Sequence, residues 1–238
     1  MSAPVLQNFR ITPAFACPIA EIMLPDNGRI NANLRSLFLN WERDPGRKRL
    51  SEPTAVAKTG VYESDFQLFN HDQPDIRLLA TQCLQYLGYL VAQLNSYSNE
   101  EMSRLRIYHH SWFHITRNNG YTAAHNHPMA SWSGVYCVDP GNPPPAKGIN
   151  NGALRFFDPR TLGNSYLDQG NAYLGAPYGI AEQAYQLQAG MLLLFPSYLV
   201  HEVSPYFGDR ERITVAFNAW VQDHREPAMN PSVTKRNP

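Results

Sequence analysis

The sequence has few of the features that mark membrane, secreted or nucleic-acid-binding proteins. It contains only three cysteines in 238 residues, an odd number without metal-type spacing, which indicates reduced thiols in a reducing compartment. Its 20 basic and 20 acidic residues cancel, whereas nucleic acids and membrane surfaces attract proteins with a field of one sign. A dense apolar run, Met191–Phe195, is far shorter than the roughly 20 residues of a membrane span. We therefore expect a cytoplasmic protein with no nucleic acid or membrane partner.

The composition suits one compact domain with a substantial core. Hydrophobic residues make up 43% of the chain and charged residues 17%, a balance that is unlike that of disordered proteins. We expect a single domain over residues 1–238, because barrels and sandwiches of this size commonly form one unit. Within it, residues 1–103 are expected to form a helical buttress with N-terminal strands and loops, 104–222 a β-rich core, and 223–238 a frayed tail. The N-terminal helices and the tail could also support a homodimer.

Two helices are predicted in the first hundred residues. Apolar residues recur at helical spacing over Ile30–Trp41, and Pro45 with the glycine after it ends this run. A second apolar stripe follows over Ile76–Leu94, with Pro74 as its start signal. Cys83 lies on this stripe and is expected to be a core residue. The segment between the two helices is expected to be a loop with one short strand at most.

From about residue 104 the pattern changes to short segments rich in β-branched and aromatic residues. Six strands are predicted: Leu105–Thr116, Ser131–Val138, Ala153–Phe157, Tyr185–Gln188, Met191–Phe195 and Arg212–Val221. So many strands without an intervening long helix imply an antiparallel sandwich or barrel, against which the two helices pack. The expected fold class is therefore mainly β with flanking helices, an α+β arrangement. Two long loops, 139–151 and 161–184, interrupt the strands, and such loops often cover or form a binding site.

Three histidines form the most informative pattern. His125 and His127 are two residues apart, so on an extended segment both imidazoles lie on the same face and can reach one cation. His201 follows much later, after several predicted strands. Two close ligands on one strand and a third from a later strand are how a barrel builds a three-ligand face around a metal ion. Such a face leaves the remaining coordination positions open for substrates.

Other residues are weaker candidates for the metal. Asp158 could replace His127 as the third ligand, but it lies beyond the opposite end of another predicted strand and is ranked lower. The remaining histidines are not expected to be ligands: His109, His110 and His114 are interpreted as cross-strand residues or as supports for the ligands, and His71 and His224 as solvated loop residues.

The last predicted strand is polar on one face. From Arg212 onward, apolar residues alternate with a face that carries Arg212, Thr214 and Asn218. If this face points inward, Arg212 needs an anionic ligand, because an unpaired buried guanidinium is costly. A dicarboxylate would satisfy it through two parallel hydrogen bonds. The alternation fits equally well a strand whose Arg212 face points to solvent.

In this order, the motifs resemble those of the iron(II)/2-oxoglutarate-dependent oxygenases. The resemblance is nearest to a bacterial and phage branch that carries a His-x-His motif, and it covers about residues 104–222. Five stretches carry it: His125–Pro128, Ser131–Tyr136, Gly152–Pro159, Phe195–His201 and Arg212–Asn218. It implies a double-stranded β-helix, a jelly-roll or cupin-like barrel, and an enzyme that uses Fe(II), 2-oxoglutarate and O2. The implied reaction oxidises, and most often hydroxylates, a C–H bond of a small organic substrate and releases succinate and CO2.

The resemblance also implies roles for individual residues. His125 and His201 match the two histidine ligands of the family, and His127 stands where the wider superfamily has a carboxylate. Arg212 matches the residue that binds the distal carboxylate of 2-oxoglutarate. Ser133 and Asn218 fall where the pocket walls of the family are expected. Trp112, Trp132 and Tyr136 are further candidates for these walls, although a plain core position is the favoured interpretation for each of them.

Two other interpretations fit a three-histidine site. A cupin-type dioxygenase that uses iron without 2-oxoglutarate has no need for an inward-facing Arg212. A non-enzymatic jelly roll could hold zinc in a closed site. Three neutral imidazoles also leave a metal one charge unit more positive than two imidazoles and a carboxylate would, which is expected to alter its redox potential and its anion binding.

Overall fold

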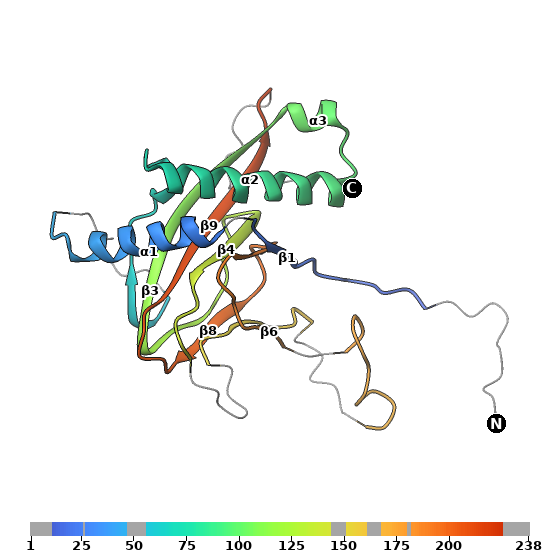
Figure 1. The fold of residues 1–238 in the computed structure, drawn as a ribbon. Coiled ribbons are helices and arrows are strands. Elements are labelled where there is room, and N and C mark those ends of the chain that lie inside the picture. The colour runs from blue at the N-terminus through green and yellow to red at the C-terminus, as the bar shows by residue number, and fades with distance from the viewer. Residues whose placement is uncertain are drawn as a thin grey trace.

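An antiparallel sheet with two long helices on one face forms the frame of the molecule (Figure 1). The computed structural model describes residues 11–25, 27–46, 56–143, 151–160, 168–179 and 182–225. Its strands are β1 (Ala20–Met23), β2 (Lys58–Glu63), β3 (Leu105–His125), β4 (Trp132–Asp139), β5 (Leu154–Phe156), β6 (Gln183–Tyr185), β7 (Met191–Pro196), β8 (His201–Tyr206) and β9 (Arg212–Asp223). Its helices are α1 (Asn27–Arg43), α2 (Pro74–Asn95), the short α3 (Asn99–Ser103) and a 3-10 turn at Leu68–Asn70.

The sheet curls because its longest strand changes partners along its length. The strand order is β1-β7-β4-β9-β3-β8-β5-β6, with β2 also paired to β3. The first part of β3 pairs with β9, from Leu105 opposite Asp223 to Thr116 opposite Arg212. Its last part pairs with β8, where His125 lies opposite His201. The strands thereby curl into a half-barrel, which confirms the predicted mainly-β fold class with the double-stranded β-helix architecture.

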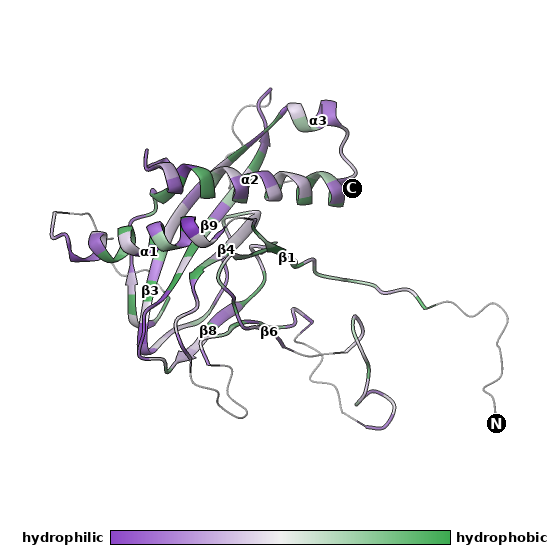
Figure 2. Ribbon diagram, in the orientation of Figure 1, coloured by the Kyte–Doolittle hydropathy of each residue, from purple (hydrophilic) through white to green (hydrophobic). Residues whose placement is uncertain are grey.

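The two helices cover the outer face of this half-barrel. Pro74 lies in the first turn of α2, where its missing N–H is not needed, and Ser96 ends the helix in a left-handed conformation with φ 56°. Both helices carry apolar and polar residues around their circumference (Figure 2), and their buried apolar residues join one core with the outward side chains of the sheet. Phe38 of α1, for example, stacks on Phe113 of β3 with ring centroids 4.2 Å apart. Full burial of such a side chain contributes roughly 1.5–3 kcal/mol.

The predicted helices and a short strand before α2 are confirmed, whereas the strand predictions need three corrections. The strand predicted at Leu105–Thr116 continues to His125, because its second half gains new partners in β2 and β8. The strand predicted at Tyr185–Gln188 occupies Gln183–Tyr185 instead. The third correction adds β1 and β8, which no sequence pattern indicates. β8 contains a glutamate and a proline within its six residues, and β1 is a four-residue strand at the edge of the sheet.

Parts of the predicted loops and most of the tail lie outside the described residues. These parts are residues 144–150, 161–167, 180–181 and 226–238. Cys83 is a buried free thiol, as expected of a core residue. Cys137 is also buried and free, and burial raises its pKa to about 12.

Among the described residues, no helix is long and apolar enough to cross a membrane.

Candidate metal centre

The structure brings His125, His127 and His201 together at one end of the cavity inside the half-barrel. His125 is the last residue of β3 and His201 the first of β8, and the pairing of these strands sets the two opposite each other. His127 follows two residues after His125, where its backbone N–H donates to the carbonyl of Ser197 at 2.9 Å. One ligand atom from each of the three histidines lies within 4.8 Å of the other two. This spacing suits three ligands of a single ion.

Backbone carbonyls fix the orientation of two of the rings. Nδ1 of His125 lies 2.8 Å from the carbonyl oxygen of Ala123, and Nδ1 of His201 lies 2.8 Å from that of Leu199. A carbonyl can only accept, so in both rings Nδ1 carries the proton and Nε2 keeps its lone pair. This pattern, in which Nδ1 donates to a backbone carbonyl and Nε2 is left free to bind a cation, is typical of metal-binding histidines. The His127 ring is held differently, against the Trp112 ring at a centroid distance of 6.0 Å.

Burial keeps the three imidazoles neutral. It lowers the pKa of His201 to about 3 and that of His127 to about 4, and in both cases the nearby His125 ring adds to the effect. Burial also lowers the pKa of His125, although its hydrogen bond to Ala123 opposes the shift. Neutral imidazole is the form that binds a metal ion. The site therefore presents cation ligands without first having to release protons at neutral pH.

Arg212 lies inside the same cavity, not on the solvent face. Its side chain lines the cavity together with the three histidines, and the residue is only 3% exposed. Among the described residues, its Nη2 atom has no hydrogen-bond partner. Burial also lowers the pKa of Arg212. A guanidinium in this position is stabilised when a carboxylate binds next to it, so this cavity suits a metal-chelating acid with a second carboxylate. It argues against a closed zinc site and against a dioxygenase that does not use such an acid.

The predicted wall residues divide between the two faces of β4. Ser133 lines the cavity, and its hydroxyl lies 2.8 Å from both Asn218 Oδ1 and Ser197 Oγ. Trp132 and Tyr136 point the other way, because successive residues of a strand alternate between its faces. The hydroxyl of Tyr136 donates to Asn31 of α1 at 2.7 Å, within the core between sheet and helix. Trp132 and Tyr136 are therefore core residues, which was their favoured interpretation, whereas Asn218 and Trp112 line the cavity.

A charged group that contacts the cavity wall was not predicted. His114 lines the cavity, and its Nε2 lies 2.6 Å from a carboxylate oxygen of Glu63, which also pairs with Lys58. Burial by itself would raise the pKa of Glu63, but the hydrogen bonds and charges of His114 and Lys58 hold it at about 2. The β2–β3 pairing places Glu63 opposite His114. In the sequence, β2 lies in a segment interpreted as mostly loop. The contact between Glu63 and His114 becomes evident only from the pairing of β2 with β3.

The weaker metal candidates lie elsewhere. The Asp158 carboxylate is bound by Arg160, whose Nε donates to it at 2.9 Å, and it is not among the converging ligand atoms. His71 is not simply solvated, because its ring packs on Trp41 at a centroid distance of 4.8 Å. His109 packs against Phe69, His110 against Trp220, and the exposed His224 contacts the backbone of Arg104.

Comparisons with known proteins agree with this geometry. A family model described as "Putative 2OG-Fe(II) oxygenase" matches residues 110–218, which include the three histidines and Arg212. No curated relative matches the sequence. Among solved structures, the chain is similar to the alpha-ketoglutarate-dependent epimerase SnoN from nogalamycin biosynthesis, with TM-score 0.55, 14% identity, and coverage of 86% of this chain and 77% of that one.

A second similar structure is the alpha-ketoglutarate-dependent carbocyclase SnoK from nogalamycin biosynthesis. Its TM-score is 0.54 at 13% identity, with coverage of 84% of this chain and 78% of that one. At these identities the structural likeness shows a shared fold. Over residues 110–218, a little under half of its length, the chain resembles the Fe(II)/2-oxoglutarate-dependent oxygenases.

Proposed function

We propose that His125, His127 and His201 hold the Fe(II) and that Arg212 binds the distal carboxylate of 2-oxoglutarate. The enzyme would then oxidise, and most often hydroxylate, a C–H bond of a small organic substrate and release succinate and CO2. One observation carries this assignment. Three neutral imidazoles converge at one end of a cavity whose wall also holds a buried guanidinium with an unpartnered Nη2 among the described residues.

The chain's own residues would bind and orient the reactants. The three imidazoles would hold the iron on one side and leave it open to 2-oxoglutarate and O2. Iron bound there would supply the activation of O2 and the oxidation. Arg212 would fix the far end of the cosubstrate through paired hydrogen bonds. Apolar side chains such as Leu154, Phe195 and Val203 line the same cavity and would exclude water from it.

The region beside the ligands supports a small organic substrate with an aromatic or aliphatic body. A second cavity of about 420 Å³ is lined by residues that flank the ligands, among them Ala124, Tyr198 and Val200. Phe157 and Pro159 add further apolar surface, and the Asp158–Arg160 pair lies at this site. The similar SnoN has been solved with Fe3+, alpha-ketoglutarate and nogalamycin RO together (TM-score 0.53, 14% identity). This fold can thus hold a metal, the cosubstrate and an organic molecule at once.

Succinate formation tests the assignment directly. With Fe(II), ascorbate and air, the wild-type protein should convert 2-oxoglutarate to succinate even without a prime substrate. Arg212→Ala should raise the 2-oxoglutarate concentration for half-maximal turnover at least about 30-fold, because the distal carboxylate of 2-oxoglutarate would be buried without its positively charged partner. Arg225→Ala is a matched control, since Arg225 forms an exposed pair with Asp223 at the far end of β9. An unchanged iron absorption spectrum on adding 2-oxoglutarate, with no succinate, would contradict the proposal.

A further inference from the structure

The Nη2 atom of Arg212 has no hydrogen-bond partner among the described residues, so no contact at this atom holds the guanidinium in place. It is the first residue of β9 and follows directly on residues 207–211, here called the β8–β9 turn. A long side chain with an unpartnered end takes its position mainly from its backbone. The contacts of the β8–β9 turn therefore decide where the guanidinium lies.

Hydrogen bonds tie the β8–β9 turn to the segment after β4. The buried hydroxyl of Tyr206 donates to the carbonyl of Arg210 at 2.6 Å and accepts from the backbone N–H of Asn142 at 2.9 Å. The side-chain oxygen of Asn142 accepts from the backbone N–H of Arg210 at 2.8 Å. Asn151 accepts from the backbone N–H of Phe207 at 2.8 Å. Both ends of the turn are thus bonded to other parts of the chain.

Close packing leaves this turn little room to move. A Cβ added at Gly141 or Gly208 would come within 2.0 and 2.1 Å, respectively, of the Tyr206 hydroxyl. Gly152 has φ +66°, and a Cβ there would lie 2.9 Å from the Tyr206 ring and 3.5 Å from Arg212 Cδ. Three glycines therefore let the backbone close around Tyr206 and the stem of Arg212.

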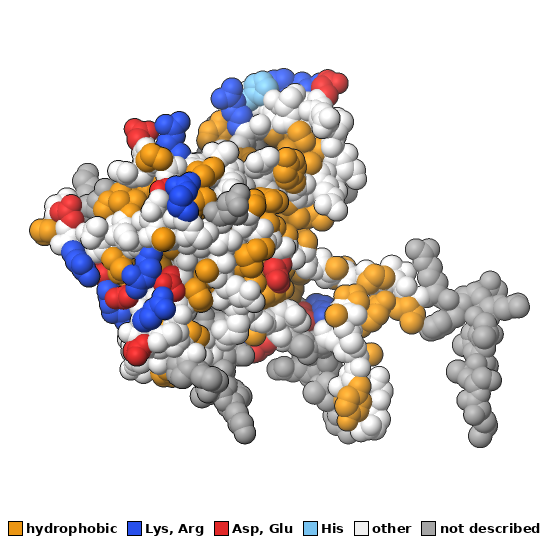
Figure 3. Space-filling view, in the orientation of Figure 1, with side chains coloured by type: hydrophobic (Ala, Val, Ile, Leu, Met, Phe, Trp, Pro, Cys, Tyr) orange, Lys and Arg blue, Asp and Glu red, His pale blue; other side chains and the backbone are white. Residues whose placement is uncertain are grey.

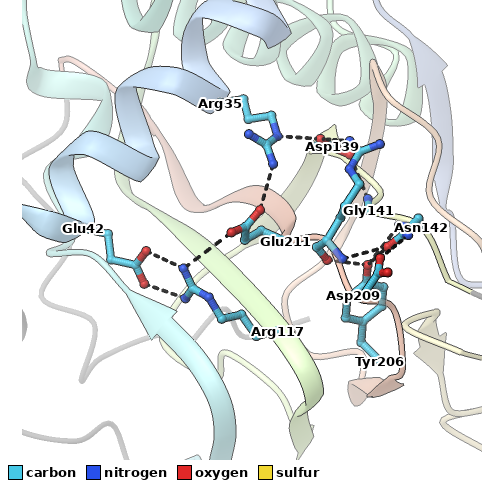
Figure 4. Close-up of polar contacts among 10 residues, drawn as sticks. Arg35, Glu42, Arg117, Asp139, Gly141, Asn142, Tyr206, Asp209 and Glu211 are labelled. Atoms are coloured by element: carbon cyan, nitrogen blue, oxygen red, sulfur yellow. Dashed lines mark hydrogen bonds and ion pairs between the residues drawn. The ribbon is translucent and has the colours of Figure 1, made fainter.

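Ion pairs then link the turn to helix α1 (Figure 4). Arg35 of α1 donates to Asp139 at the end of β4 at 2.9 Å and to Glu211 of the turn at 2.8 Å. Arg210 also donates to Asp139, at 2.8 Å. Together with the Arg117–Glu42 pair, whose guanidinium lies 3.9 Å from Glu211, these residues form what we call the Arg35 network. On this face acidic and basic side chains lie intermingled below α1 (Figure 3).

We propose that Arg35 is a positioning residue for 2-oxoglutarate: by holding Glu211 and Asp139 together it fixes the start of β9, and with it the Arg212 guanidinium. This inference rests on the role proposed for Arg212. Helix α1 lies outside the residues matched by the family model, so a part of the chain beyond the family core would set cosubstrate affinity. The side chains of Arg35 and Glu211 are 31% and 28% exposed, so solvent screens their attraction and the effect is a modest one.

The test compares Arg35→Gln, Arg35→Lys and the control Arg29→Gln. Arg29 lies on the same helix and pairs with Asp75 of α2, away from β9. The dissociation constant of 2-oxoglutarate is measured by titration calorimetry with iron(II)-loaded protein in the absence of O2. Arg35→Gln should raise it about three- to tenfold, Arg35→Lys should recover part of the loss, and Arg29→Gln should leave it unchanged. Iron affinity should be the same in all three variants, and high salt should narrow the gap between wild type and Arg35→Gln.

A purely structural role for Arg35 makes a different prediction. It would lower the thermal unfolding temperature without changing the 2-oxoglutarate dissociation constant, and that result would overturn the inference. If Arg35→Gln does not fold, Glu211→Gln breaks the other end of the same pair and should raise the dissociation constant in the same way. Arg212→Ala separates the two claims. If it does not weaken 2-oxoglutarate binding, the role proposed for Arg212 fails; if only the Arg35 and Glu211 variants have no effect, the positioning role alone fails.

Discussion

The two ends of the cavity are built on opposite principles. At the metal end, His125 and His201 each contact a carbonyl only two residues earlier in the chain, so the orientation of these rings is local. At the other end, Arg212 depends on distant contacts, since Arg35 is separated from Asp139 by 104 positions and from Glu211 by 176. The proposed metal ligands should therefore tolerate changes in the surrounding fold better than the proposed cosubstrate site does.

The largest expected effect separates the two ends. His201→Ala should lower iron(II) affinity at least about 100-fold, because it removes a proposed ligand outright. Loss of a residue that only hydrogen-bonds to a ligand typically lowers metal affinity roughly 10–100-fold. Arg212→Ala should leave iron affinity unchanged and weaken only 2-oxoglutarate binding. Metal titration and 2-oxoglutarate titration of both variants provide the check. Equal loss of iron in the two variants would show that the ends are not independent.

An intermediate effect is expected at His127. Its ring lacks the carbonyl contact of the other two and stands where the wider superfamily has a carboxylate. His127→Ala should reduce iron affinity about tenfold or more, and His127→Asp should restore much of it, because aspartate supplies a harder, charged ligand. Iron titration of the two variants distinguishes a ligand from a packing residue. If both bind iron as the wild type does, His127 is not a ligand.

The smallest expected effect concerns the cavity wall between β2 and β3. The pKa of Glu63 is held at about 2, below its usual 4.5, so folding favours the ionised form. That stabilisation is present above about pH 4.5 and is lost as the pH falls toward 2. Glu63→Gln should lower the free energy of unfolding by about 1–2 kcal/mol at pH 7, and the difference should shrink in acid.

Denaturant unfolding at several pH values measures this difference, and iron affinity at pH 7 serves as the control, because Glu63 is not among the converging ligand atoms. A difference between wild type and Glu63→Gln that does not depend on pH would mean that the ion pair is not what stabilises this wall.

Much of the fold was predictable where a periodic pattern also has clear ends. Both long helices have an apolar stripe and a proline or glycine at one end, and both are found. β1 and β8 have no such pattern and depend on neighbours that are distant in the sequence. β1 forms by pairing with β7, and β8 forms by pairing with the last part of β3. The pairing of β2 with β3 places Glu63 beside His114, which no local signal predicts.

By itself, the sequence determined that His125 and His127 share a face and that one face of the last strand carries Arg212, because side chains alternate along an extended chain. Alternation does not say which face is inside, and for this reason the pattern fitted a solvent-facing Arg212 equally well. Only the packing of α1 and α2 against one face of the sheet decided that Arg212 points inward. The pairing of β3 with β8 decided that His201 meets the other two histidines.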